Sequence, residues 1–207
     1  MALILGILIG FFIFSFRNRL IIRQNQGEIA VREVVVKNFK APKYHLLNNI
    51  TVPSQGGTTQ IDHLLISTKG VFVIETKDYS GWIFGNENSK QWTQVIYRVK
   101  NKFQNPIHQN YKHVKTILNI LDFLPKEQIH SIVVFTGNAE FKTPIPDNVI
   151  YLDQLVNCIR SYNDEVVSIN RVEFCVGRLE CRRYGVTKKT DLEHRAYLSK
   201  RFGNKFD

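Results

Sequence analysis

The 207-residue sequence has little cysteine, and its first sixteen residues contain no charged side chain. Its three cysteines, Cys158, Cys175 and Cys181, form neither a C-x-x-C pair nor a dense even-numbered set. Their scarcity argues against a disulfide scaffold and a zinc finger, and it favours a reducing compartment. The chain also lacks an internal repeat and a low-complexity linker. With 43% hydrophobic and 22% charged residues it has a globular composition, which excludes a disordered chain and a multi-span membrane protein.

The uncharged start, residues 2–16, contains a single polar side chain, Ser15. As a helix it would span about 22 Å, short of a bilayer core of about 30 Å, but the arginine stems that follow extend the usable span. A cleaved signal peptide would need a basic start and a small-residue cleavage site, and neither is present. A buried core helix is the other alternative. We expect a membrane anchor over residues 1–23, inserted through residues 2–22.

The basic residues that flank this run predict its orientation. Arg17, Arg19 and Arg23 all lie on its C-terminal side. The positive-inside rule then predicts a single-pass protein of the cell membrane, with its N-terminus outside and its body in the cytoplasm. Gly6 and Gly10 form one G-x-x-x-G, which would suit a homodimer through paired helices.

Hydrophobic periodicity predicts the elements of the body. Strands are expected at 44–52, 60–67, 70–77, 81–84, 91–99, 129–135 and 149–152, and a helix at 153–162. Asn105-Pro106 should begin a helix, because proline suits the first helical position; its expected apolar stripe is Ile107, Tyr111, Val114, Leu118 and Leu121. Residues 29–39 fit a helix or a strand. The order predicts an α/β fold with a mixed central sheet flanked by helices.

The C-terminal segment carries much of the positive charge. From Arg171 onward, ten Lys and Arg residues face five Asp and Glu residues, so this stretch holds +5 of the net +10. Nucleic acid and anionic lipid are both suitable partners for such a segment, and a solvated helix is the plainer interpretation. We treat residues 165–207 as a basic helical extension that follows a domain at residues 24–164.

A carboxylate–lysine pattern is the most informative feature. Glu75 and Lys77 share one face of their strand, because strand side chains alternate. If this strand forms a hairpin with the one before it, a two-residue loop places Asp62 opposite either Glu75 or Lys77. A three-residue loop would shift the register by one and separate the group.

Two carboxylates beside a lysine suit metal-assisted phosphoester hydrolysis. Oxygens of Asp62 and Glu75, with the main-chain carbonyl of Thr76, could bind Mg²⁺ or Mn²⁺, while Lys77 orients water or stabilises charge on the phosphate. The competing interpretation is a surface salt bridge, worth under about 1 kcal/mol. The E-x-K pattern is also common by chance, and it recurs at Glu140 to Lys142.

Several motifs together resemble a known family. They are Gly27-Glu28, Gln60-Ile61-Asp62-His63-Leu64-Leu65-Ile66, Gly70-Val71-Phe72-Val73-Ile74-Glu75-Thr76-Lys77, Tyr79-Ser80-Gly81, Gln91-Trp92 and Asn105-Pro106-x-x-Gln109. Their order resembles the nuclease-related domain (NERD) family of the restriction-endonuclease-like PD-(D/E)XK superfamily, over roughly residues 27–124. The resemblance implies an α-β-β-β-α-β core and a magnesium-dependent nuclease site, with Glu28, Asp62, Glu75, Lys77 and Gln109 as its catalytic residues.

For two of these positions, the residues themselves also allow another interpretation. Glu28 also fits a capping box begun by Asn25. Gln109 lies in the first turn of its helix, where free N–H groups favour an anion, and Lys112 and His113 share its face. We therefore expect Lys112 and His113 to contact nucleic acid, with a solvated helix face as the alternative. His63, on the opposite strand face from Asp62, is expected in the core or next to the ligands of the site, not as a ligand itself.

These observations predict a membrane-anchored, cytoplasm-facing, metal-dependent nuclease that acts on DNA in preference to RNA. A non-catalytic nucleic-acid-binding or membrane-tethered interaction module on the same fold is the alternative. A protein whose basic tail reads anionic lipid is a third hypothesis.

Overall fold

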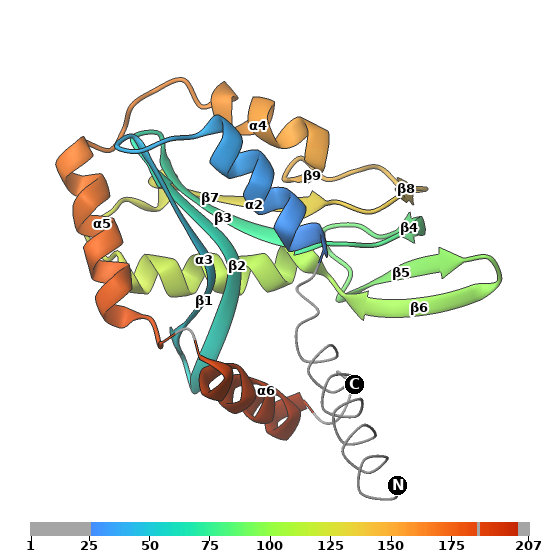
Figure 1. The fold of residues 1–207 in the computed structure, drawn as a ribbon. Coiled ribbons are helices and arrows are strands. Elements are labelled where there is room, and N and C mark those ends of the chain that lie inside the picture. The colour runs from blue at the N-terminus through green and yellow to red at the C-terminus, as the bar shows by residue number, and fades with distance from the viewer. Residues whose placement is uncertain (1–25, 186, 203–207) are drawn as a thin grey trace, which may run out of the picture.

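The computed structural model describes residues 26–185 and 187–202 (Figure 1). Two short 3₁₀ helices, η1 (Lys126–Gln128) and η2 (Leu152–Gln154), join the longer elements. The helices are α2 (Gln26–Asn38), α3 (Pro106–Ile120), α4 (Leu155–Ser161), α5 (Ile169–Arg182) and α6 (Lys188–Phe202). The strands are β1 (Tyr44–Ser54), β2 (Gly57–Ser67), β3 (Gly70–Lys77), β4 (Gly81–Phe84), β5 (Gln91–Ile96), β6 (Val99–Gln104), β7 (Ile129–Phe135), β8 (Ala139–Phe141) and β9 (Val149–Tyr151).

The main sheet has five strands in the order β1-β2-β3-β7-β9. The first three are antiparallel neighbours, whereas β7 and β9 run parallel to β3. The parallel connection from β3 to β7 passes through α3, as such crossovers require. The prediction of a mixed α/β fold with flanking helices is confirmed.

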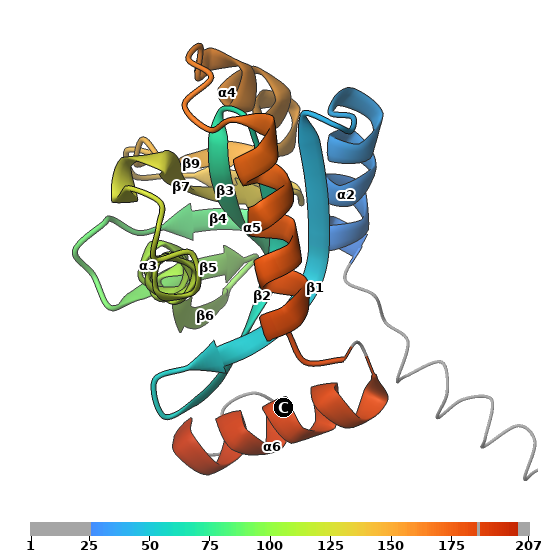
Figure 2. The same cartoon turned by 90° about the vertical axis from the view of Figure 1, so that its left-hand side faces the viewer.

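Helices cover both faces of this sheet. Helices α2 and α4 pack on one face, where Val31, Val35 and Ile159 meet Phe72 and Ile74. Helices α3 and α5 pack on the other, and Figure 2 shows α2 and α5 on opposite sides of β1. Of residues 29–39, which fitted either a helix or a strand, all but Phe39 belong to α2, because a buried face at Val31 and Val35 follows helical spacing.

Helix α3 begins where the sequence predicts, but its buried face differs from the expected stripe. The Asn105 side chain accepts a hydrogen bond from the Ile107 N–H and caps the helix. The expectation for Tyr111 was wrong, because its side chain is 56% exposed. Asn110 is buried instead, and its amide nitrogen donates to the carbonyls of Val73 and Ile132 on two neighbouring strands.

A second sheet has the strand order β6-β5-β4-β8. In the chain, β4, β5 and β6 lie between β3 and α3, and β8 follows β7. The sequence predicted β4 and a strand over 91–99. That strand ends at Ile96, because the chain turns at Tyr97, whose φ is +53°, and β6 follows. Strand β8 was not predicted. The inner face of this sheet packs Ile83 and Trp92 against Phe135 of β7, so both sheets share one core.

The C-terminal residues pack on this body. Helix α5 buries Val172, Cys175 and Leu179 in the core that α3 also lines, and α6 lies against the β1–β2 turn, where Thr58 Oγ1 and His194 Nδ1 are 2.7 Å apart. In the two ranges that the structure describes, no helix has the length and apolar character to cross a bilayer. The predicted anchor at residues 1–23, with Gly6 and Gly10, lies outside the described residues, as does the Asn25 cap.

Candidate functional site

The site forms where β2 and β3 stop pairing. Their backbone ladder runs from Ser67–Gly70 to His63–Ile74, and the next positions in that register are Asp62 and Glu75. This is the first of the two predicted registers. Beyond the ladder, the Thr76 N–H donates to Asp62 Oδ2 at 2.8 Å instead of to a β2 carbonyl.

The end of the ladder also affects the Thr76 carbonyl. In a strand, the N–H and C=O of one residue point to the same side, and those of the next residue point to the other. The Lys77 carbonyl accepts from the Thr136 N–H, on the β7 side. The Thr76 carbonyl therefore faces the β2 side, towards Asp62.

Lys77 connects the strand to α3. Its Nζ donates to Glu75 Oε1 at 2.7 Å and to Gln109 Oε1 at 3.1 Å. Gln109 lies in the first turn of α3, which Asn105 caps, so the cap sets the height at which Gln109 meets the strand. The structure thus brings together Asp62, Glu75, Lys77 and Gln109 from three elements.

His113 is buried and completes the surroundings of Glu75. Its Nε2 lies 3.2 Å from Glu75 Oε2 without forming an aligned hydrogen bond, and its Nδ1 lies 2.9 Å from Thr59 Oγ1. The sequence placed His113 among the nucleic-acid contacts because it shares a helix face with Gln109. In the structure the His113 side chain is buried beside Glu75, whereas the Lys112 side chain is exposed.

Glu28 lies in the first turn of α2, on the opposite face of the sheet from α3. Its carboxylate acts on Asp62 through charge, as one of the groups that raise the pKa of Asp62. His63 is buried, as expected, and its Nδ1 lies 2.8 Å from Asn48 Oδ1.

The two acids of the site respond to burial differently. Burial raises the pKa of Asp62 well above its usual range, and the charges of Glu75 and Glu28 add to the effect, against the Thr76 N–H and Lys77. Burial also opposes ionisation of Glu75, but Lys77 and His113 outweigh it and lower the pKa of Glu75. Burial disfavours the Lys77 ammonium, yet Glu75 raises the pKa of Lys77, which stays protonated.

The oxygens at this site fit a hard divalent cation. Glu75 Oε2 is buried and accepts no hydrogen bond, and Asp62 uses only one oxygen for Thr76. Among the described residues, no group of three or more His, Cys, Asp and Glu side chains could hold a metal ion, so a third protein ligand would come from the main chain. The Thr76 carbonyl faces the right side for that role. A divalent cation would also offset the charge repulsion that raises the pKa of Asp62.

Comparison with known proteins agrees with this geometry. The family model for the nuclease-related domain (NERD) matches residues 23–136, which include every residue of the site. An uncharacterized protein of Bacillus anthracis is 37% identical over 183 residues, which cover 85% of this chain and 84% of that protein. No solved structure matches the chain.

Proposed function

Because the chain belongs to the nuclease-related domain family, we propose that it is a metal-dependent nuclease that hydrolyses phosphodiester bonds, with DNA favoured over RNA. The observation that carries the proposal is the gathering of Asp62, Glu75 and Lys77 where the β2–β3 ladder ends. A protein that only bound polyanions would gain nothing from two partly or fully buried carboxylates, because they repel phosphate.

Asp62, Glu75 and the Thr76 carbonyl would hold Mg²⁺ or Mn²⁺, since hard cations prefer oxygen ligands. When bound, the cation would polarise a phosphate oxygen and help to ionise water. Glu28 would add negative charge near Asp62, which strengthens attraction for a cation.

Lys77 would act as a hydrogen-bond donor and a positive charge, not as a base. Its pKa is raised by Glu75 even though burial opposes the charged form, so its ammonium persists at neutral pH. An ammonium held between Glu75 and Gln109 can donate to the attacking water or to the phosphate oxygens on which charge develops. Gln109 would fix the direction of that ammonium, and exposed Lys112 would contact the substrate backbone.

We further propose that residues 1–23 anchor the protein in the cell membrane with the domain in the cytoplasm. The support is the uncharged run of sixteen residues followed by Arg17, Arg19 and Arg23. Pairing of two anchors through Gly6 and Gly10 would make a homodimer.

The test is cleavage by the full-length chain of labelled DNA and RNA, each as single strand and duplex, with Mg²⁺, Mn²⁺ or a chelator. We expect metal-dependent cleavage that Asp62→Asn removes, because the amide loses the charge but retains an acceptor for the Thr76 N–H. Unchanged cleavage in Asp62→Asn, or no cleavage with any substrate and metal, would contradict the proposal. Binding without cleavage would favour the non-catalytic module.

A further inference from the structure

The outer face of the second sheet carries exposed aromatic and basic side chains. Cross-strand partners share a face, and Val95 lies between Trp82 and Lys100. In the next row Thr93 lies between Phe84 and Lys102. We call this face, with Tyr97 at the β5–β6 turn, the aromatic platform; its residues are Trp82, Phe84, Tyr97, Lys100, Lys102 and Lys142.

The aromatic residues of the platform are exposed to an extent that packing does not explain. Trp82 is 49% exposed and Tyr97 is 97% exposed, whereas Trp92, on the inner face of the same sheet, is fully buried. Exposed aromatic rings lose the hydrophobic stabilisation that burial would give them, and they are frequent in binding sites.

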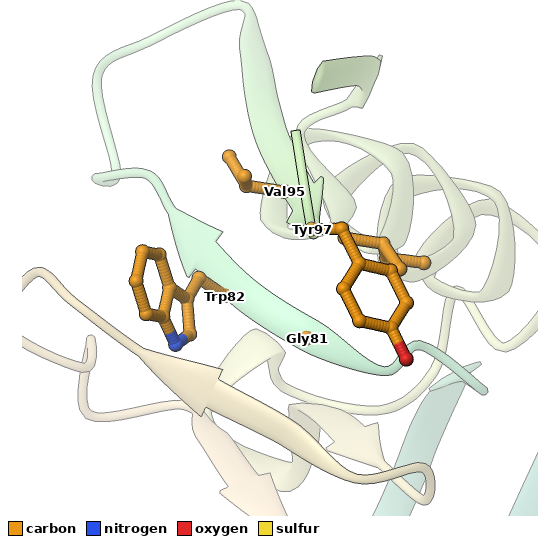
Figure 3. A pocket seen from close by; sticks show the side chains of 5 residues that line it. Gly81, Trp82, Val95 and Tyr97 are labelled. Atoms are coloured by element: carbon orange, nitrogen blue, oxygen red, sulfur yellow. The ribbon is translucent and has the colours of Figure 1, made fainter. Parts of the chain in front are cut away.

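A pocket of about 390 Å³ lies among these rings. Figure 3 shows Trp82 and Tyr97 on either side of Gly81, which has no side chain to fill the space. Gly81 has φ of +83°, and a Cβ there would come within 2.5 Å of the Val95 carbonyl oxygen. The backbone thus needs glycine at this position, and glycine leaves the gap between the two rings.

The platform carries a net positive charge, although one acid, Glu140 of β8, shares its face as the cross-strand partner of Trp82 and pairs with Lys142. Residues 90–104 contain four basic residues, Lys90, Arg98, Lys100 and Lys102, and no acidic residue. The ammonium of Lys142, the residue after β8, lies 4.8 Å from the centroid of the Trp82 ring, a cation–π contact that holds the ring. Basic residues interleaved with exposed rings favour a ligand that combines negative charge with flat apolar surfaces.

The platform is joined to the site at both ends. Three residues, 78–80, separate Lys77 from β4, so Trp82 lies within about 17 Å of Lys77 even along a fully extended backbone. At the other end, β6 leads through Asn105 into α3 and Gln109. A strand of nucleic acid lying on the platform could therefore reach the carboxylates within a few nucleotides.

We propose that the aromatic platform binds an unpaired nucleic-acid strand, whose bases stack on Trp82 and Tyr97 and whose phosphates pair with Lys100 and Lys102. The inference rests on the proposed nuclease function and names its substrate class. A duplex hides the faces of its bases, so only an unpaired strand can use the rings. The same rings would give little preference among bases, because each base has a face to stack.

The experiment measures binding of the full-length chain to fluorescent single-stranded and duplex oligonucleotides of equal length, with a chelator present so that no cleavage occurs. Trp82→Ala and Tyr97→Ala should each raise the single-strand Kd by roughly 5-fold to 100-fold and leave the duplex Kd unchanged. Trp82→Phe should keep most of the affinity. Tyr184→Ala is the matched control, since Tyr184 is 46% exposed and its N–H bonds to Thr51 of β1, away from the platform.

The outcomes separate this inference from the nuclease proposal. Loss of single-strand affinity in Trp82→Ala and Tyr97→Ala supports the platform even if the wild-type chain cleaves nothing. Equal single-strand Kd values for wild type and both variants would overturn it even if cleavage depends on Asp62. Failure of the wild-type chain to bind a single strand, or tighter binding to duplex, would overturn it as well, as would a defect in both alanine variants that Tyr184→Ala shares.

Discussion

The chain contains the pattern E-x-K twice, and the two copies occupy very different surroundings. In both, the lysine Nζ pairs with Oε1 of the glutamate two residues before it. The Glu75 side chain is 2% exposed, whereas that of Glu140 is 62% exposed. Opposite Glu75 the register places an acid, Asp62, but the partner of Glu140 is Trp82.

The contrast shows that the triplet itself does not make a site. Glu75 gains its properties from burial, from His113 on α3 and from Asp62 at the end of a ladder. Glu140 has its pKa lowered chiefly by the hydrogen bond from Lys142, as any exposed salt bridge would do. Glu140 is surrounded by solvent, and Trp82, not a second carboxylate, lies opposite it, so its position does not suit a metal ion as that of Glu75 does.

Among the changes that should leave some cleavage or only alter stability, the largest expected effect comes from removing the lysine of the buried triplet. Lys77→Met should lower kcat by about 10²-fold to 10³-fold, because an ammonium aimed at developing charge is lost from a water-poor site. Steady-state cleavage with Mn²⁺ measures it. Lys126→Met is the control, since that side chain is 81% exposed and lies on η1. A Lys77→Met variant as active as the control would contradict the role given to Lys77.

The second largest effect is expected in the free energy of unfolding, which should depend on Glu75 much more than on Glu140. Glu75→Ala should lower the free energy of unfolding by about 3 kcal/mol, because it leaves Lys77 partly buried without its carboxylate. Urea unfolding followed by circular dichroism measures the change. A loss below about 1 kcal/mol would mean that the buried pair contributes no more than a surface pair does.

The burial of His63, which follows Asp62 on β2, should make the free energy of unfolding depend on pH. Burial lowers the pKa of His63 from 6.5 to about 4, so the folded protein excludes a proton that the unfolded chain binds. The stability from His63 is therefore present above pH 6.5 and is lost as the pH falls towards 4, by about 2 kcal/mol at pH 5 relative to pH 7.5. Urea unfolding at both pH values measures the loss, and His63→Gln should remove most of it. An unchanged loss in that variant would assign it to other groups.

The smallest effect is expected at the exposed triplet. Glu140→Ala should change the free energy of unfolding by less than about 1 kcal/mol, since solvent screens the pair that it makes with Lys142. The same urea titration measures it. A loss as large as that of Glu75→Ala would remove the distinction between the two regions.

Much of the main sheet could be predicted from the sequence, because its strands are apolar runs with clear turns. The short hairpin loop left three registers open, two of which gather Asp62, Glu75 and Lys77, and the structure has the one that places Asp62 opposite Glu75. The start of α3 at Asn105-Pro106 could also be predicted, since it depends on local capping. Local signals therefore predicted the positions of the strands and of the α3 cap.

Features that depend on distant partners could not be predicted in this way. The buried face of α3 carries Asn110 and His113, which periodicity reads as polar surface, and they are buried because strand carbonyls and Glu75 contact them. Strand β8 has three residues and forms only against β4. The turn at Tyr97 requires a positive φ from a residue that rarely adopts one, so the end of β5 gave no signal.

Cleavage by the paired variants Glu75→Gln and Glu140→Gln tests the central claim most directly. Both changes remove one carboxylate charge from an E-x-K triplet at nearly constant volume, and the full-length chain would be assayed on labelled single-stranded DNA with Mn²⁺. We predict that Glu75→Gln loses measurable cleavage while Glu140→Gln keeps the wild-type rate. Cleavage retained by Glu75→Gln, or lost equally in both variants, would contradict the assignment of the site.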